Sequence, residues 1–224
     1  MDGTGNLFSP LLRVLSDFDY EVIALPIIGD QDYCSITKKV REKLPEEDFI
    51  LIAESFSGPV GAAFAKEKVA NLKGIIFVAT FLSAPSKLLL AFAKFLPLKI
   101  LSALPFSKFF HRTLFLGSDA SNELIDLFQS TIKSLPTTLI RARLSAMYSL
   151  SHSPDVHELP VAYIQATSDK LVPSEKTVEF SNSFNNIIIK TVEGPHFILQ
   201  AKPTECAVII SKLVPLLTRQ ATGQ

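Results

Sequence analysis

The sequence predicts an α/β protein, a three-layer sandwich in which helices cover both faces of a mostly parallel β-sheet. Short runs of β-branched and other apolar residues alternate along the chain with segments of helical spacing. The runs are almost continuously apolar, which is typical of strands buried on both faces of a parallel sheet. The alternation of strand, helix and strand favours the three-layer arrangement over a sandwich of two sheets.

The expected elements follow one another in a regular order. Strands are predicted over residues 21–27, 49–53, 74–79, 161–166 and 187–192. Helices are predicted over residues 32–44, 59–69, 174–184 and 203–218. Pro215 is expected to end or kink the last helix, because proline lacks the amide that the helix would use.

Residues 83–152 interrupt this alternation. The segment is rich in Leu, Phe and Lys, and its spacing predicts several helices and no strand. We therefore expect an α/β core formed by residues 1–82 and 153–224, and a helical cap inserted as residues 83–152. Such a cap would lie over the carboxyl ends of the strands, where sheets of this kind bind ligands. Its apolar side chains are expected to pack onto the core and to line a hydrophobic pocket.

The composition excludes several classes of function. The 22 basic and 22 acidic residues balance, so no charge-driven binding to nucleic acid or to an anionic membrane is expected. Cys34 and Cys206 stand alone, which argues against a metal site and against a disulfide framework. The amino terminus does not have the pattern of a signal peptide, and lysines and prolines interrupt the most apolar stretch, residues 88–106. We expect no membrane-spanning segment and a cytoplasmic location.

The segment DFILIAESFSGPVGAAFA carries the strongest chemical signal, a candidate nucleophile at Ser55. A strand that turns sharply into a helix lifts the serine hydroxyl clear of the sheet. The turn requires small residues two positions before and after the serine, and Ala53 and Ser57 stand there. Taken alone, the same pattern fits equally well a serine that caps a helix.

A serine nucleophile needs a base, and the base needs an orienting carboxylate. Of the four histidines, only His196 follows a predicted strand and so lies at its carboxyl end; the others are His111, His152 and His157. Asp169 follows the preceding strand. Each could have a plainer role, His196 as a surface residue and Asp169 as a turn former. Their chain order of Ser, Asp and His is the order expected of a triad on this kind of sheet.

With these motifs in place, the whole chain resembles the α/β-hydrolase superfamily. The likeness is greatest to small bacterial hydrolases with a DGTG segment, an ESFSGP elbow, a helical cap, and SDKLVP and GPH loops. The resemblance implies ester hydrolysis through an acyl-enzyme, with Ser55 as nucleophile, Asp169 as acid and His196 as base. It also implies that the backbone N–H of Phe56 is one donor of the oxyanion hole.

The amino end departs from that pattern. In relatives an apolar strand and a short turn precede the DGTG segment, whereas here Met1 stands directly before Asp2. The resemblance implies that the first core strand is missing from the sheet, between residues 21–27 and 49–53. It also implies that the second oxyanion donor is the amino group of Met1 or the amide of Asp2. Either the start of the chain is assigned too late, which we favour, or the chain is a truncated form.

The expected function is therefore that of a serine hydrolase that cleaves a small-molecule carboxylic ester with an apolar acyl or alcohol group. Water is the second substrate, so no cofactor and no metal are expected. Two alternatives remain open: a thioesterase or acyltransferase with the same triad, and an inactive, truncated hydrolase that serves as a binding module. The sequence does not indicate the physiological ester or the oligomeric state.

Overall fold

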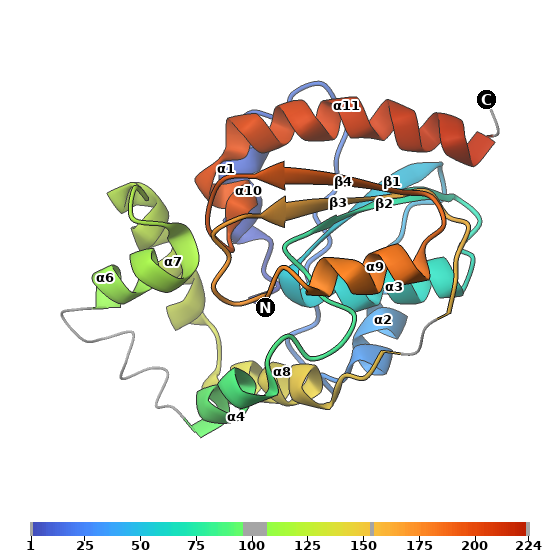
Figure 1. Cartoon of the computed structure of the whole chain (residues 1–224). Helices are drawn as coiled ribbons and strands as arrows, with labels where there is room; N and C mark the ends of the chain where they lie inside the picture. The colour runs from blue at the N-terminus through green and yellow to red at the C-terminus, as the bar shows by residue number, and fades with distance from the viewer. Residues whose placement is uncertain (1, 96–106, 153–154, 223–224) are drawn as a thin grey trace.

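The computed structural model describes residues 2–95, 107–152 and 155–222, and a parallel sheet lies at its centre (Figure 1). The strands are β1 (Phe49–Glu54), β2 (Leu72–Val78), β3 (Val161–Ala166) and β4 (Ile187–Val192). They lie side by side in chain order, and every neighbouring pair is parallel. These bounds match four of the predicted strands to within two residues.

Helices cover both faces of the sheet, as the sequence predicts. On one face lie α1 (Ser9–Leu12), α10 (Ile198–Ala201) and α11 (Pro203–Thr222); on the other lie α2 (Tyr33–Arg41), α3 (Gly58–Lys66) and α9 (Lys176–Ser183). Successive residues of β2 point alternately into the apolar core on one face of the sheet and into the core on the other face. Ile75 and Phe77 pack with the α3 and α9 side, whereas Ile76 and Val78 pack with the α11 side. Burial on both faces explains why the strand is apolar throughout.

Local sequence explains where α2 begins, but it does not explain where α11 ends. Asp32 caps α2, since its carboxylate accepts a hydrogen bond from the Ser35 amide. Pro215 was expected to end or kink the last helix. It does not end the helix, because α11 continues to Thr222. Leu213 and Leu217 flank the proline and are almost fully buried. Their packing against the sheet holds the helix together across the missing amide.

Residues 21–27 do not form the predicted strand. The segment is extended, but it has no strand assignment and pairs with none of the four strands. Its backbone is fastened at Leu25, whose amide donates to the carbonyl of Gly3. A strand needs a neighbour at hydrogen-bonding distance. Here a cavity, described below, separates the segment from β1, and this accounts for the wrong prediction.

The described part of residues 83–152 is helical and contains no strand. Its helices are α4 (Lys87–Phe95), α6 (Ser107–His111), the π-helical turn η3 (Arg112–Leu116), α7 (Asn122–Ser134) and α8 (Thr137–Ser149). Figure 1 shows α6 and α7 beyond the carboxyl ends of β3 and β4, while α4 and α8 pack against each other. None of the helices described is long and apolar enough to cross a membrane.

Candidate active site

The connection from β1 to α3 is a tight turn that places Ser55 at the carboxyl end of the sheet. Ser55 opens the 3₁₀ turn η2 (Ser55–Ser57) with a φ of 53°, a left-handed conformation that is uncommon for serine. The Ser57 hydroxyl donates to the Glu54 carbonyl across 2.8 Å, and the Thr80 hydroxyl donates to the Ser55 carbonyl. These bonds hold the strained turn in place.

Gly58 is required at this turn because Thr80 lies directly against it. A Cβ at position 58 would lie 2.0 Å from Thr80 Oγ1 and under 3.0 Å from two other atoms of that side chain. The glycine therefore lets α3 start close to the end of β2. The strand, the turn and the helix together hold the Ser55 hydroxyl in one direction.

The three candidate triad residues lie within hydrogen-bond distance of one another. Ser55 Oγ lies 2.7 Å from His196 Nε2, and His196 Nδ1 lies 2.7 Å from Asp169 Oδ2. A carboxylate accepts hydrogen bonds, so Nδ1 carries the proton and Nε2 is free to accept one from the serine. All three side chains are buried.

Asp169 is itself fixed by backbone contacts. Its Oδ1 accepts hydrogen bonds from the amides of Leu171 and Val172, at 2.8 and 2.9 Å. This leaves Oδ2 aimed at His196. The same carboxylate thus stabilises the turn through Oδ1 and contacts His196 through Oδ2.

The other three histidines lie apart from Ser55. His111 ends α6 and contacts Gln129, and His152 contacts Ser183. His157 forms an isolated bridge with Phe184 at the amino end of β3. Burial lowers the pKa of His111 and of His157, which favours their neutral forms.

The structure describes two of the three residues predicted to supply oxyanion donors, Asp2 and Phe56. Met1 lies outside the described residues. Asp2 and Phe56 border the same cavity as Ser55. The Asp2 carboxylate accepts hydrogen bonds from the amide and the hydroxyl of Thr4, which orders the loop. The Phe56 ring is buried and stacks on Tyr33, with 5.0 Å between the ring centroids.

A buried arginine, which the sequence reasoning missed, joins the helical segment to this loop. Arg143 of α8 is fully buried and donates to the carbonyls of Asp2 and Pro26, at 2.7 and 2.8 Å. Its Nε donates to the side chain of Gln31 at 3.0 Å. The sequence held a signal: Arg143 occupies an apolar position of the α8 period, in line with Leu139, Ile140, Leu144 and Met147.

Glu54, which precedes Ser55, is buried. Only 9% of its surface is exposed. One carboxylate oxygen accepts a hydrogen bond from Gln200 at 2.9 Å, and the other has no partner. Burial raises the pKa of Glu54 to about 7, although the bond from Gln200 and the nearby His196 oppose this shift.

An aromatic cluster joins the triad to the helices of residues 83–152. The His196 ring meets Phe197 edge-on at 5.2 Å between centroids. Phe197 contacts Phe115 of η3 and Phe128 of α7, at 6.2 and 5.2 Å. The surroundings of the histidine are therefore apolar on this side.

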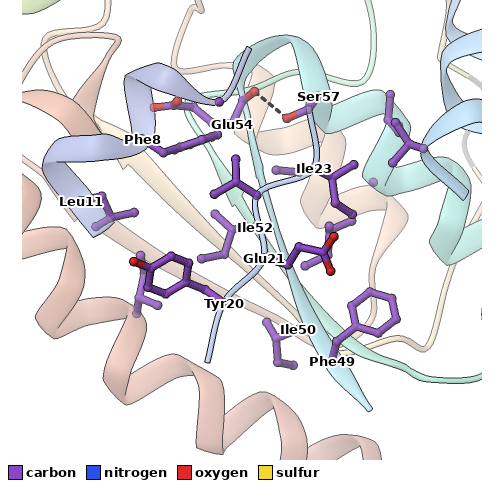
Figure 2. A pocket seen from close by; sticks show the side chains of 18 of the residues that line it. Phe8, Leu11, Tyr20, Glu21, Ile23, Phe49, Ile50, Ile52, Glu54 and Ser57 are labelled. Atoms are coloured by element: carbon purple, nitrogen blue, oxygen red, sulfur yellow. Dashed lines mark hydrogen bonds between the residues drawn. The ribbon is translucent and has the colours of Figure 1, made fainter. Parts of the chain in front are cut away.

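A cavity of about 660 Å³ runs from Ser55 along the open side of β1. We call it the β1 cavity, and Figure 2 shows it from close by. Its walls are the strand β1, the extended segment of residues 20–25, and apolar side chains of α1, α3 and α11. Glu54, Ser55 and Phe56 lie at one end of it. Among the residues that the structure describes, no group of His, Cys, Asp or Glu is arranged to hold a metal ion.

The chain matches known proteins by fold. The family model described as the alpha/beta hydrolase fold matches residues 16–203. No curated protein matches the chain by sequence. An esterase from Thermogutta terrifontis is 15% identical, with a TM-score of 0.77 over 96% of this chain and 86% of that one. An esterase from Exiguobacterium antarcticum is 13% identical, with a TM-score of 0.76 over 95% and 88%.

The fold is shared with other chemistries as well. An epoxide hydrolase is 15% identical, with a TM-score of 0.70 over 93% of this chain and 86% of that one. Identities this low relate the folds and leave the reaction open. The match of the family model covers most of the chain, and the parallel sheet with helices on both faces agrees with it. The chain therefore belongs to the alpha/beta hydrolase fold family.

Proposed function

We propose that the protein is a serine hydrolase that cleaves carboxylic esters, with Ser55 as nucleophile, His196 as general base and Asp169 as the residue that orients the base. The observation that carries the proposal is the continuous contact from Ser55 Oγ to His196 to Asp169, at 2.7 Å in both steps. A serine hydroxyl is a weak nucleophile without such a base.

In the proposed reaction His196 Nε2 takes the proton of Ser55 as Oγ bonds to the ester carbonyl carbon. The tetrahedral intermediate collapses, the bond to the alcohol oxygen breaks, and His196 gives its proton to the leaving alcohol. Water then loses a proton to His196 and attacks the acyl-enzyme, which releases the acid and restores Ser55. Asp169 stabilises the imidazolium that forms in each half of the reaction.

The negative oxygen of the intermediate needs hydrogen-bond donors in place before the reaction. We propose the backbone amide of Phe56 as the first donor and the amide of Asp2, or the amino group of Met1, as the second. Asp2 borders the cavity together with Ser55, and Arg143 holds its carbonyl. This contact would fix the loop that carries the second donor.

The proposed substrate is an ester with an apolar acyl or alcohol group. The His196 ring meets Phe197 edge-on, and Phe197 in turn contacts Phe115 and Phe128. We propose that residues 83–152 act as a cap, since α6 and α7 lie beyond the carboxyl ends of β3 and β4. Two of the similar structures are described as esterases, which favours an ester over other acyl groups.

The test is covalent labelling of the purified protein with a fluorophosphonate probe, which reacts with activated serines. We expect the wild-type protein to be labelled, and Ser55→Ala to lose labelling and ester turnover by roughly 10³-fold or more. Ser211→Ala on α11 is the matched control and should behave as wild type.

Circular dichroism of each variant shows whether it is folded. A folded wild-type chain that resists the probe, or a folded Ser55→Ala variant that keeps full ester turnover, would contradict the proposal. A panel of esters and thioesters of equal acyl length then separates an esterase from a thioesterase.

A further inference from the structure

Glu54 is a buried carboxylate that stands directly before the nucleophile in the chain. It is the last residue of β1, and Ser55 opens the turn that follows. Burying a carboxylate is costly unless its surroundings favour the charge. An apolar side chain would fill the same space at lower cost, so packing alone does not account for a glutamate at this position.

Glu54 is joined to the segment that carries His196. Gln200 lies on α10, four residues after His196, and only 3% of its surface is exposed. Its Nε2 donates a hydrogen bond to Glu54 Oε2 across 2.9 Å. The Cys206 thiol donates to the Ile198 carbonyl at 3.6 Å and so joins α10 to α11. The bond between Gln200 and Glu54 thus ties the loop of the proposed base to the residue beside the nucleophile.

This bond leaves one oxygen of each side chain unused. Glu54 Oε1 and Gln200 Oε1 are both buried, and neither has a hydrogen-bond partner among the described residues. Unpaired buried oxygens lower stability. If the pair served stability alone, two apolar side chains would serve it better. The arrangement therefore points to a role for the charge of Glu54 itself.

The groups that face Glu54 indicate what this role is. His196 acts to lower the pKa of Glu54, because a positive imidazole favours a nearby carboxylate, whereas the Asp2 carboxylate acts to raise it. On α11, burial raises the pKa of Cys206 to about 12, so its thiol is neutral, and Gln200 on α10 carries no charge. Electrostatic coupling is mutual, so an ionised Glu54 also favours the positive form of His196.

We propose that Glu54 is a positioning residue of the active site. When ionised, it stabilises the positive charge that His196 gains as it takes the proton of Ser55. Through Gln200 it also holds the loop of His196 in place. The inference rests on the proposed function, in which His196 is the base. Asp169 contacts the same ring directly at Nδ1, whereas Glu54 acts across buried space, where charges interact more strongly than in water.

The proposal predicts a pH dependence that follows the ionisation of Glu54. Burial raises the pKa of Glu54 to about 7, so its carboxylate is charged above that pH and mostly neutral below it. Glutamine has the shape of the neutral form and cannot gain the charge. Glu54→Gln should therefore react like wild type at about pH 5.5 and more slowly than wild type at about pH 8.5.

The rate of fluorophosphonate labelling of the full chain measures this effect, because the probe reacts with Ser55 and needs the same base. At about pH 8.5 we expect Glu54→Gln to be labelled roughly tenfold more slowly than wild type, and at about pH 5.5 within about twofold of wild type. Glu205→Gln is the control, since Glu205 is an exposed carboxylate on α11. It should match wild type at every pH.

A second variant tests the same charge without changing Glu54. Gln200→Met removes the hydrogen bond that favours the ionised carboxylate, so Glu54 should become charged at a higher pH. The ratio of the labelling rate of Gln200→Met to that of Glu54→Gln should then rise at a higher pH than the same ratio for wild type. Circular dichroism establishes that each variant is folded.

The outcomes separate this inference from the proposed function. If wild type is labelled at Ser55 but its rate relative to Glu54→Gln is the same at every pH, Glu54 has only a structural role and the inference is wrong. Equal rates for the two proteins above the pKa of Glu54 would overturn it as well. If the folded wild-type chain is not labelled at all, the proposed function fails and this inference fails with it.

Discussion

At the scale of single residues, Glu54 and Ser55 are neighbours in sequence that differ in how fully their polar groups are hydrogen-bonded. The Ser55 hydroxyl contacts His196, and its carbonyl accepts from Thr80. Glu54 is buried with one carboxylate oxygen unpartnered, which is costly for a charged group. The protein reduces that cost by keeping Glu54 protonated to a higher pH, and this has a measurable consequence for stability.

Replacing Glu54 with Gln should make the stability less dependent on pH. The pKa of Glu54 rises from 4.5 to about 7 on burial, so between these values the folded state binds more protons than the unfolded state. Stability therefore falls as pH rises through this window, by about 3 kcal/mol in total. Below pH 4.5 this loss is absent, and above about 7 it is complete.

Urea unfolding of wild type and Glu54→Gln between pH 4.5 and 8.5 measures this effect. Glu175→Gln, at an exposed position just before α9, is the control and should keep the wild-type pH dependence. Parallel stability curves for wild type and Glu54→Gln would show that Glu54 does not titrate in this range.

The sequence predicted which side chains meet at the carboxyl edge of the sheet, and missed those whose burial involves contacts between distant parts of the chain. Ser55, Asp169 and His196 each follow a strand, and parallel strands bring their carboxyl ends to one edge. The hydrogen-bond partner of the buried Glu54 carboxylate is Gln200, far away in sequence. The acceptors of Arg143 lie on loops near the amino terminus, so no local pattern identifies them.

At the scale of elements, α8 and the amino-terminal loop are joined by one side chain. Arg143 holds the carbonyls of Asp2 and Pro26, on either side of the contact between Leu25 and Gly3. Arg143 also lies over the Phe56 ring, with its Cζ 5.7 Å from the ring centroid. The position of the loop therefore depends on a helix that lies more than a hundred residues further along the chain.

Arg143→Met should destabilise the protein and disturb the site. Methionine keeps much of the volume but removes the donor from two partly buried carbonyls, which costs roughly 2–4 kcal/mol. We expect slower fluorophosphonate labelling as well, because the loop of Asp2 loses its support. Arg141→Met, on the exposed side of the same helix, is the control and should change neither quantity. If Arg143→Met had the same stability and the same labelling rate as the wild type, Arg143 would not support the loop of Asp2.

Most elements were predictable because each apolar run has a partner within the described chain. Residues 161–166 and 187–192 form strands with the predicted bounds, since β3 and β4 pair with each other along their full length. Residues 21–27 have the same apolar pattern but no partner, and so they do not form a strand. Strand propensity describes side chains, whereas a strand also needs a hydrogen-bonded neighbour.

At the scale of the whole molecule, the sheet is protected at one edge and open at the other. β4 carries the exposed Lys190 and Thr191 just before its last residue, Val192, whereas β1 faces the β1 cavity and residues 20–25. Backbone that makes few hydrogen bonds opens at low free-energy cost. The segment between α1 and α2 is therefore expected to open before the rest of the fold.

Limited proteolysis with chymotrypsin tests this order of opening. We expect the first cleavage after Tyr20, which is 52% exposed and lies in the extended segment. Tyr148 is 39% exposed but lies in α8, so its backbone is held by helical hydrogen bonds and cleavage there should be slower. Mass spectrometry identifies the fragments. Cleavage at Tyr148 first would mean that α8 is less stable than the segment along the β1 cavity.

The helical segment of residues 83–152 has a consequence for the order in which the sheet assembles. The connection between β1 and β2 spans residues 55–71, whereas that between β2 and β3 spans residues 79–160. With logarithmic scaling of loop entropy, the longer closure costs about 1.4 kcal/mol more. The β1–α3–β2 unit should then form early in folding. Helices within residues 83–152 shorten the long connection once they form, so their folding speeds the arrival of β3 and, with it, of Asp169 and His196 beside Ser55.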